Sequence, residues 1–213
     1  TEVMNQGRKI LACIVQREKE HREPEGVYRT AAADIRGISR EEILAGIRDG
    51  GPTGMGGAGF PTHAKLTSEA EYILLNGAEC EPLLRVDQQL MAIYPDEIIK
   101  GLVEAGRLKK KKKAIIGIKK KHGEVIELLQ SRIDALGLSQ QAEVKLLPDI
   151  YPAGDEQVLV YQLTGRIVPE TGIPIMVGCV VINSETALNI YRASQGLPAT
   201  EKYITVAGDV PNR

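Results

Sequence analysis

The chain has 213 residues, of which 43% are hydrophobic and 26% are charged, and its formal net charge at pH 7 is -1. This balance is typical of a soluble globular protein of one or two domains, and it gives no electrostatic indication of nucleic-acid binding. No apolar run approaches the length of a membrane span. The three cysteines, Cys13, Cys80 and Cys179, form no Cys-x-x-Cys pair. The chain therefore lacks the ligand set for its own iron–sulfur cluster or cysteine zinc site, and scattered thiols indicate a reducing, cytoplasmic setting.

The first part of the chain reads differently from the rest. A strand is predicted at 10–15, and the polar stretch that follows it reads as a linker. Residues 1–34 are therefore expected to be the remnant of an upstream module and its linker, and 35–200 to form the main domain. Because the chain ends soon after a strand-like run, residues 201–213 are expected to begin a following module.

A glycine-rich loop is the most informative stretch. Ser39 and Glu42 fit the capping box of a helix over 39–49, and six glycines then fall within 50–59. Glycine lets the backbone approach a ligand closely, and a helix that opens directly behind the loop offers free N–H groups to a phosphate. The sequence therefore predicts a phosphate-binding loop, with a flexible surface loop as the alternative.

Two common phosphate motifs fit this loop poorly. The Gly-Lys-Ser/Thr ending of a P-loop is absent. Gly54, Gly56 and Gly59 match the dinucleotide fingerprint, with Glu79 about 20 residues further on. That fingerprint must follow a strand, however, and here it follows a predicted helix, so we treat the match as accidental.

Helices and strands alternate over the rest of the chain. The predicted helices lie at 60–70, 95–107, 123–136, 154–164 and 184–195, and the predicted strands at 72–76, 114–118, 144–147, 177–182 and 203–206. This alternation predicts an α/β fold with a Rossmann-like, mostly parallel sheet flanked by helices. Two lysine-rich runs, 109–113 and 119–121, flank one strand. We expect them to be solvated loops, with a basic binding patch as the alternative.

Polar clusters follow three of the predicted strands, at 76–82, 148–157 and 183–186. Ligands of open α/β sheets bind outside the carboxyl ends of the strands, so these clusters and the glycine loop are expected to form one site. Each cluster also allows a simpler interpretation. Asn183 is a good helix N-cap, and Asp155 and Glu156 favour a helix start. Phe60, the only phenylalanine, is either a stacking platform or a core anchor for the loop.

The motifs together resemble those of a known flavoprotein family. In chain order they are Gly54-Met-Gly-Gly-Ala-Gly-Phe-Pro-Thr-His-Ala-Lys65, Asn76-Gly-Ala-Glu-Cys-Glu-Pro82, Tyr151-Pro-Ala-Gly-Asp-Glu156 and Asn183-Ser-Glu-Thr186. The family comprises the FMN- and NADH-binding subunit of respiratory complex I and the C subunit of the Rnf electron-transport complex. Its relatives include cobalamin reductase and the electron-transfer protein of proline reductase. The resemblance covers about 35–210, and the second motif is similar to the Rnf-C-like branch.

The resemblance implies two ligands and no metal in this chain. It assigns the FMN contacts to Gly54, Met55, Gly56, Gly57, Lys65, Asn76, Glu79, Cys80, Gly154, Asp155, Glu156, Asn183 and Thr186. It assigns the NADH contacts to Phe60, Glu81 and Glu156, of which the two glutamates are the expected catalytic residues. The FMN phosphate is expected at Asn183 and Thr186, where the start of a helix also suits an anion.

The resemblance also implies an activity. The chain would be an NADH-linked flavoprotein oxidoreductase domain that accepts hydride on FMN and passes electrons to iron–sulfur clusters outside this chain. Its partners would be NADH and redox subunits or iron–sulfur modules, with no nucleic acid and no direct membrane insertion. We expect a cytoplasmic location, either free or held at the cytoplasmic face of the membrane through partner subunits.

The chain departs from the complex I pattern at several positions. Met55 stands where that pattern has arginine, Ala78 where it has aspartate, and Ile182 where it has the first of two asparagines. The segment 165–178 is short and lacks the lysine and phenylalanine that help complex I to hold NADH. These departures bear on NADH more than on FMN. They leave two alternatives: a flavin domain fed by a protein donor, and a non-catalytic docking domain that has lost the cofactor.

Overall fold

The computed structural model describes residues 2–5, 8–11, 37, 39–57, 59–109 and 113–206. Two short strands, β1 (Glu2–Asn5) and β2 (Arg8–Leu11), pair antiparallel near the N-terminus. The strand predicted at 10–15 overlaps β2 at its first two positions, and its remainder lies outside the described residues.

A four-stranded parallel sheet forms the centre of the molecule. Its strands are β3 (Tyr72–Gly77), β4 (Ala114–Lys119), β5 (Ala142–Leu147) and β6 (Cys179–Asn183), in the spatial order β5-β4-β3-β6. Strands β4 and β5 therefore lie successively on one side of β3, and the last strand, β6, pairs with the other side of β3. The predicted α/β class is confirmed, and the reversal between β3 and β6 is the kind of switch point at which such sheets bind ligands.

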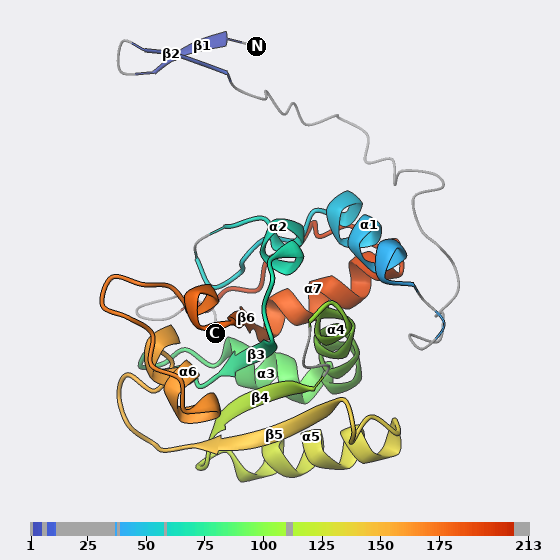
Figure 1. Cartoon of the computed structure of the whole chain (residues 1–213), viewed down its shortest axis with the longest axis vertical. Coiled ribbons are helices and arrows are strands. Elements are labelled where there is room, and N and C mark those ends of the chain that lie inside the picture. The colour runs from blue at the N-terminus through green and yellow to red at the C-terminus, as the bar shows by residue number, and fades with distance from the viewer. Residues whose placement is uncertain are drawn as a thin grey trace.

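Helices cover both faces of this sheet (Figure 1). In chain order they are α1 (Arg40–Gly50), α2 (Thr62–Thr67), α3 (Val86–Ile93), α4 (Pro95–Arg107), α5 (Gly123–Ala135), α6 (Glu156–Thr164), the 3-10 helix η2 (Pro174–Val177) and α7 (Ser184–Ser194). Every predicted helix is confirmed, although α2 is shorter than expected. Sequence reasoning missed α3 and η2. The capping box of α1 is also confirmed, with the Glu42 N–H donating to Ser39 Oγ at 3.2 Å and the Ser39 N–H to Glu42 Oε2 at 2.9 Å.

The strand predicted at 203–206 is wrong. These residues belong to no strand of the structure. Tyr203 donates its backbone N–H to the Glu185 carboxylate at 3.0 Å. The acceptor of this hydrogen bond is therefore a side chain and not the backbone of a neighbouring strand.

The core has two parts because successive strand residues point to opposite faces of the sheet. In β3, Ile73 and Leu75 join the cluster formed with α1, α3, α4, α5 and α7, whereas Leu74 joins the smaller cluster on α6. All three side chains are fully buried. No helix in the described part of the chain is long and apolar enough to cross a membrane.

The lysine-rich runs are not simply solvated, which corrects one expectation. Lys109 is only 3% exposed, and its Nζ donates to the carbonyl oxygens of Leu66 at 2.8 Å and Ser68 at 2.9 Å. Burial lowers the pKa of Lys109 to about 8. Lys119 is also buried, with its Nζ 3.8 Å from Asp149 Oδ1. A lysine stem can cross apolar surface to reach carbonyls at a helix end, and Lys109 does so at the end of α2. Residues 110–112 lie outside the described residues.

Candidate functional site

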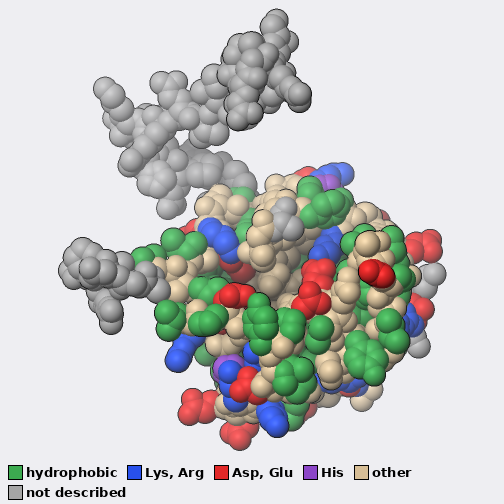
Figure 2. Space-filling model, turned by 90° about the vertical axis from the view of Figure 1, so that its left-hand side faces the viewer, with side chains coloured by type: hydrophobic (Ala, Val, Ile, Leu, Met, Phe, Trp, Pro, Cys, Tyr) green, Lys and Arg blue, Asp and Glu red, His purple; other side chains and the backbone are tan. Residues whose placement is uncertain are grey.

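A hollow of about 330 Å³ opens at the carboxyl ends of β3 and β6. Asn76 and Asn183, which end the two strands, are direct partners in the parallel register. Figure 2 looks onto this edge, where acidic and basic side chains lie beside a depression in the surface. We call it the carboxyl-edge hollow, and its lining consists of Asn76, Glu79, Cys80, Glu81, Asp87, Tyr151, Pro152, Gly154, Asp155 and Asn183. Its volume falls in the range typical of ligand pockets.

Hydrogen bonds join the end of β3 to the loop before α6. The Asn76 side-chain amide donates to the Gly154 carbonyl at 2.8 Å, and Asn76 Oδ1 accepts from the Ala78 N–H at 3.2 Å. The Gly154 N–H in turn donates to Cys80 Sγ at 3.0 Å. A Cβ at residue 154 would lie 3.2 Å from this sulfur, so glycine allows the close approach. The predicted clusters at 76–82 and 148–157 therefore meet, as the sheet-edge argument requires.

Glu79 and Asp87 are two of the four carboxylates that line the hollow. Glu79, whose φ is 34°, accepts from the Val86 N–H at the start of α3 at 2.7 Å. Asp87, one residue further into α3, accepts from the Ser184 N–H at the start of α7 at 3.1 Å. Burial raises the pKa of both groups, and the Asp87 charge raises the pKa of Glu79 further. Glu79 Oε2 is buried and has no hydrogen-bond partner among the described residues, so it remains available to a ligand.

Asp87 is the main residue that sequence reasoning missed in this hollow. It lies on α3, the helix that was not predicted. The apolar spacing of Val86 and Leu90, with Asp87 in the first turn, is a helical signal that could have found it.

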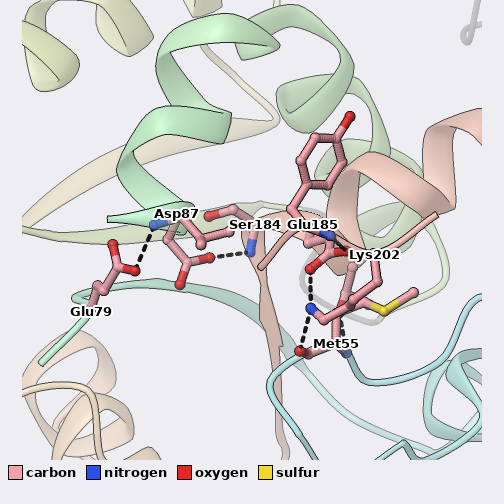
Figure 3. Close-up of polar contacts among 9 residues, drawn as sticks. Met55, Glu79, Asp87, Ser184, Glu185 and Lys202 are labelled. Carbon is pink, nitrogen blue, oxygen red and sulfur yellow. Dashed lines mark hydrogen bonds and ion pairs between the residues drawn. The ribbon is translucent and has the colours of Figure 1, made fainter. Parts of the chain in front are cut away.

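The glycine loop lies against the first turn of α7 (Figure 3). The Met55 N–H donates to Thr186 Oγ1 at 3.1 Å. A Cβ at Gly56 would run into the Asn183 side-chain amide, with Asn183 Cγ at 3.0 Å. Gly57 has a φ of 117°, which a side chain rarely allows. Asn183 occupies the N-cap position of α7, but its side chain makes no capping hydrogen bond, so capping alone does not explain this residue.

A second, mostly apolar hollow of about 280 Å³ lies between α2, α6 and η2. It is lined by Phe60, Ala64, Lys65, Ser68, Glu156, Ile173, Pro174, Ile175, Cys179 and Val180. Phe60 is 53% exposed, so its interpretation as a core anchor is wrong. The structure places Lys65 here, with its Nζ 3.9 Å from Glu156 Oε1.

Consecutive residues of the chain line the two hollows, Asp155 the first and Glu156 the second. Asp155 has a structural role as well, since its carboxylate caps α6 by accepting from the N–H groups of Gln157 at 2.9 Å and Val158 at 3.2 Å. The expected NADH contacts divide between the hollows, with Phe60 and Glu156 in the apolar hollow and Glu81 in the carboxyl-edge hollow.

These residues fit a flavin nucleotide. The carboxyl-edge hollow offers amide, thiol and carboxyl groups to a polar ring edge, including the free Glu79 Oε2. The glycine loop and the start of α7 lie beside it, where backbone N–H groups suit a phosphate.

Comparison with known proteins points to the same cofactor. The sequence model of the Nuo51 FMN-binding domain matches residues 47–192. Cobalamin reductase PduS of Citrobacter freundii is 43% identical over 171 residues, which cover 80% of this chain and 37% of the relative. The C subunit of the proton-translocating ferredoxin:NAD(+) oxidoreductase complex of Clostridium ljungdahlii is 33% identical over 205 residues, which cover 94% of this chain and 44% of the relative.

A solved structure shares the fold. The crystal structure of an NAD+-reducing [NiFe]-hydrogenase in its H2-reduced state superposes with a TM-score of 0.66 at 25% identity, covering 76% of this chain and 32% of that chain. The chain thus spans less than half the length of each of these relatives. The motifs, the fold and the family match agree, and the chain belongs to the Nuo51 FMN-binding domain family, whose members include Rnf-type C subunits and cobalamin reductases.

Proposed function

We propose that this domain binds FMN in the carboxyl-edge hollow, takes hydride from NADH bound in the apolar hollow, and delivers electrons to iron–sulfur centres outside this chain. One observation carries the proposal: the consecutive residues Asp155 and Glu156 line two hollows of different chemistry. A polar hollow suits a flavin head, and an apolar hollow with an exposed aromatic ring suits a second flat ring. Asp155 and Glu156 would then lie between the two sites, where the nicotinamide of NADH must reach the flavin ring.

The protein residues would position the two ligands and control charge. When bound, FMN supplies the conversion between a two-electron hydride donor and one-electron acceptors. Asn76 and Gly154 would orient its ring edge, and Phe60 would stack on the dinucleotide. Glu79 and Asp87, whose pKa values are raised by burial, would hold a proton beside the ring more readily than exposed carboxyls. Glu81 and Glu156 are the proposed catalytic contacts to NADH.

The proposal includes the surroundings of the domain. We infer that 35–200 is the FMN-binding domain and that 1–34 and 201–213 lie outside it. The parent protein would be a cytoplasmic oxidoreductase or a subunit held at the membrane by its partners. Relatives named as subunits of redox complexes support this assembly.

A protein donor in place of NADH is the second candidate. Met55 and Ile182 depart from the complex I pattern, and the segment between α6 and η2 is short. An apolar hollow with Ile173 exposed at its rim would also accept a partner's side chain.

An FMN titration of the purified chain, followed by anaerobic addition of NADH, tests these proposals. We expect saturable FMN binding and loss of the oxidised-flavin absorbance when NADH is added. Binding without loss of absorbance would support the protein donor. Absence of binding would contradict both and leave a docking domain without cofactor.

Two glycine substitutions, one at the proposed site and one away from it, make the test specific to that site. In Gly56→Ala the added Cβ would press on Asn183, and we expect the FMN Kd to rise about tenfold, which corresponds to roughly 1.4 kcal/mol. Gly123→Ala is the matched control because a Cβ there meets nothing within 4 Å. An equal effect of both substitutions would place the flavin elsewhere.

A further inference from the structure

The segment that follows α7 contacts the glycine loop through Lys202 (Figure 3). Lys202 donates from Nζ to the Met55 carbonyl oxygen at 3.0 Å and forms an ion pair with the Glu185 carboxylate. Tyr203 donates its backbone N–H to the other oxygen of that carboxylate at 3.0 Å. Lys202 and Tyr203 thus both bind the Glu185 carboxylate, and Lys202 also contacts the glycine loop.

The Glu185 side chain is 4% exposed, whereas the Lys202 side chain is 47% exposed. A carboxylate this deeply buried at the start of a helix needs a cationic partner, because removing the partner leaves an uncompensated buried charge. Asp87 lies close by, accepting from the Ser184 N–H. The Glu185 charge raises the pKa of Asp87, and the Lys202 charge lowers it. Lys202 therefore offsets negative charge where the anionic phosphate of FMN is proposed to bind.

Met55 is held from both of its backbone polar groups. Its N–H donates to Thr186 Oγ1 at 3.1 Å, and its carbonyl accepts from Lys202 Nζ at 3.0 Å. Glycines stand on both sides of Met55, and a glycine-rich segment loses more conformational entropy on ordering than other segments do. Two fixed hydrogen bonds at its centre would order the loop before a ligand arrives, which favours binding.

We propose that Lys202 is a positioning residue of the flavin site, fixing the glycine loop on the first turn of α7 in the geometry that receives the cofactor phosphate. The inference rests on the proposed function. Its consequence is that the segment leaving the α/β domain holds the cofactor loop in place. FMN affinity therefore depends on the contacts of Lys202 with Met55 and Glu185.

The test compares Lys202→Met with the unsubstituted chain in two measurements. Fluorescence titration should show the FMN Kd raised at least tenfold. Hydrogen–deuterium exchange of the FMN-free protein should show faster exchange of the amides in 54–60. Lys202→Arg keeps both the charge and the donors and should bring the Kd back to within threefold.

Lys145→Met is the matched control. The Lys145 side chain is 43% exposed, donates to the Leu163 carbonyl at 2.8 Å and lies 3.8 Å from Glu143 Oε1. It therefore makes the same types of bond on the β5 side of the sheet, away from the glycine loop, and its replacement should leave both measurements within twofold. If the unsubstituted chain binds FMN and Lys202→Met binds it equally well, the inference is wrong. If the unsubstituted chain binds none, it is the proposed function that fails, and exchange of 54–60 still tests the loop contact.

A double variant separates charge compensation from loop positioning. Adding Glu185→Gln to Lys202→Met removes the uncompensated carboxylate, so the double variant should unfold at nearly the temperature of the unsubstituted chain. Its Met55 carbonyl still lacks the lysine donor, so its FMN Kd should stay raised at least tenfold. Recovery of the original Kd would overturn the inference, because Lys202 would then serve only to neutralise Glu185.

Discussion

Helix α7 borders two regions in which a glycine has different structural roles. Along its length it packs against α4, where a Cβ at Gly101 would meet the Ala187 carbonyl and lie 2.9 Å from the Tyr191 nitrogen. At its first turn it supports the exposed Gly56 beside the carboxyl-edge hollow. In the first region glycine lets two helices touch, and in the second it leaves room for the Asn183 side chain.

The comparison predicts which measurement should respond to each change. A larger side chain at the α4–α7 interface presses on backbone inside a close-packed core, so it should lower the stability of the whole chain. A change at the carboxyl-edge hollow meets side chains that can move or solvent, so it should alter ligand binding more than folding.

Gly101→Leu should have the largest effect. Its side chain would have to separate α4 from α7, and we expect a loss of about 3 kcal/mol or more in the free energy of unfolding. Urea denaturation followed by circular dichroism measures the loss, with Gly123→Ala as the control, which should change stability by less than about 0.5 kcal/mol. Equal stability of the two variants would mean that the helices are not in contact at Gly101.

The buried Glu104 gives the interface a pH dependence. It lies on α4 facing α7, and Ser194 Oγ donates to its Oε1 at 2.9 Å. Burial raises the pKa of Glu104 from 4.5 to about 8. The folded chain therefore keeps this proton up to about pH 8, whereas the unfolded chain releases it near 4.5. The stabilisation is complete below pH 4.5 and is lost as the pH rises through about 8.

We expect this loss to reach about 2 kcal/mol, below the ceiling set by 1.36 kcal/mol per pKa unit, because neighbouring groups adjust to the charge. Glu104→Gln keeps the shape without the ionisation and should flatten the dependence in urea titrations between pH 5 and 9. Glu127→Gln, at an exposed position of α5, should leave the slope unchanged. A slope unaltered by Glu104→Gln would assign the dependence to other groups, such as Asp87 and Glu79, whose pKa values are also raised.

Sequence patterns predicted the elements whose signals are local. The capping box of α1 and the short apolar runs of β3 and β4 are complete within a few residues, and both were found. Helix α3 was missed although its apolar spacing is helical, because the N–H of Val86 is bonded by Glu79, seven residues earlier and outside any capping pattern.

The same limit applies to the candidate site. Nine of the ten residues that line the carboxyl-edge hollow lie in the three polar clusters expected at strand ends, and Asp87 is the exception. Lys202 was not predicted, since its partner Met55 is 147 residues away along the chain. Lys109 looked like part of a solvated run, and only its bond to the Leu66 carbonyl in α2 shows where the buried side chain lies.

Asp155 provides the prediction with the smallest expected effect. It tests whether one residue stabilises the fold, contributes to ligand binding, or does both. Its carboxylate caps α6 and also lines the carboxyl-edge hollow. Asp155→Ala removes the cap and should lower the free energy of unfolding by about 1 kcal/mol. Asp155→Ser keeps an N-cap acceptor and should retain most of that stability, which thermal denaturation of the two variants would measure.

FMN affinity of the same two variants separates the roles. If Asp155 contacts the cofactor, Asp155→Ser should bind FMN several-fold more weakly although its helix remains capped. If Asp155 acts only as a cap, Asp155→Ser should bind FMN like the unsubstituted chain, and Asp155→Ala should lose affinity only to the extent that α6 frays. The second result would assign this edge of the hollow to backbone geometry set by α6, and Asp155 would then belong with Gly101 among the residues that build the fold.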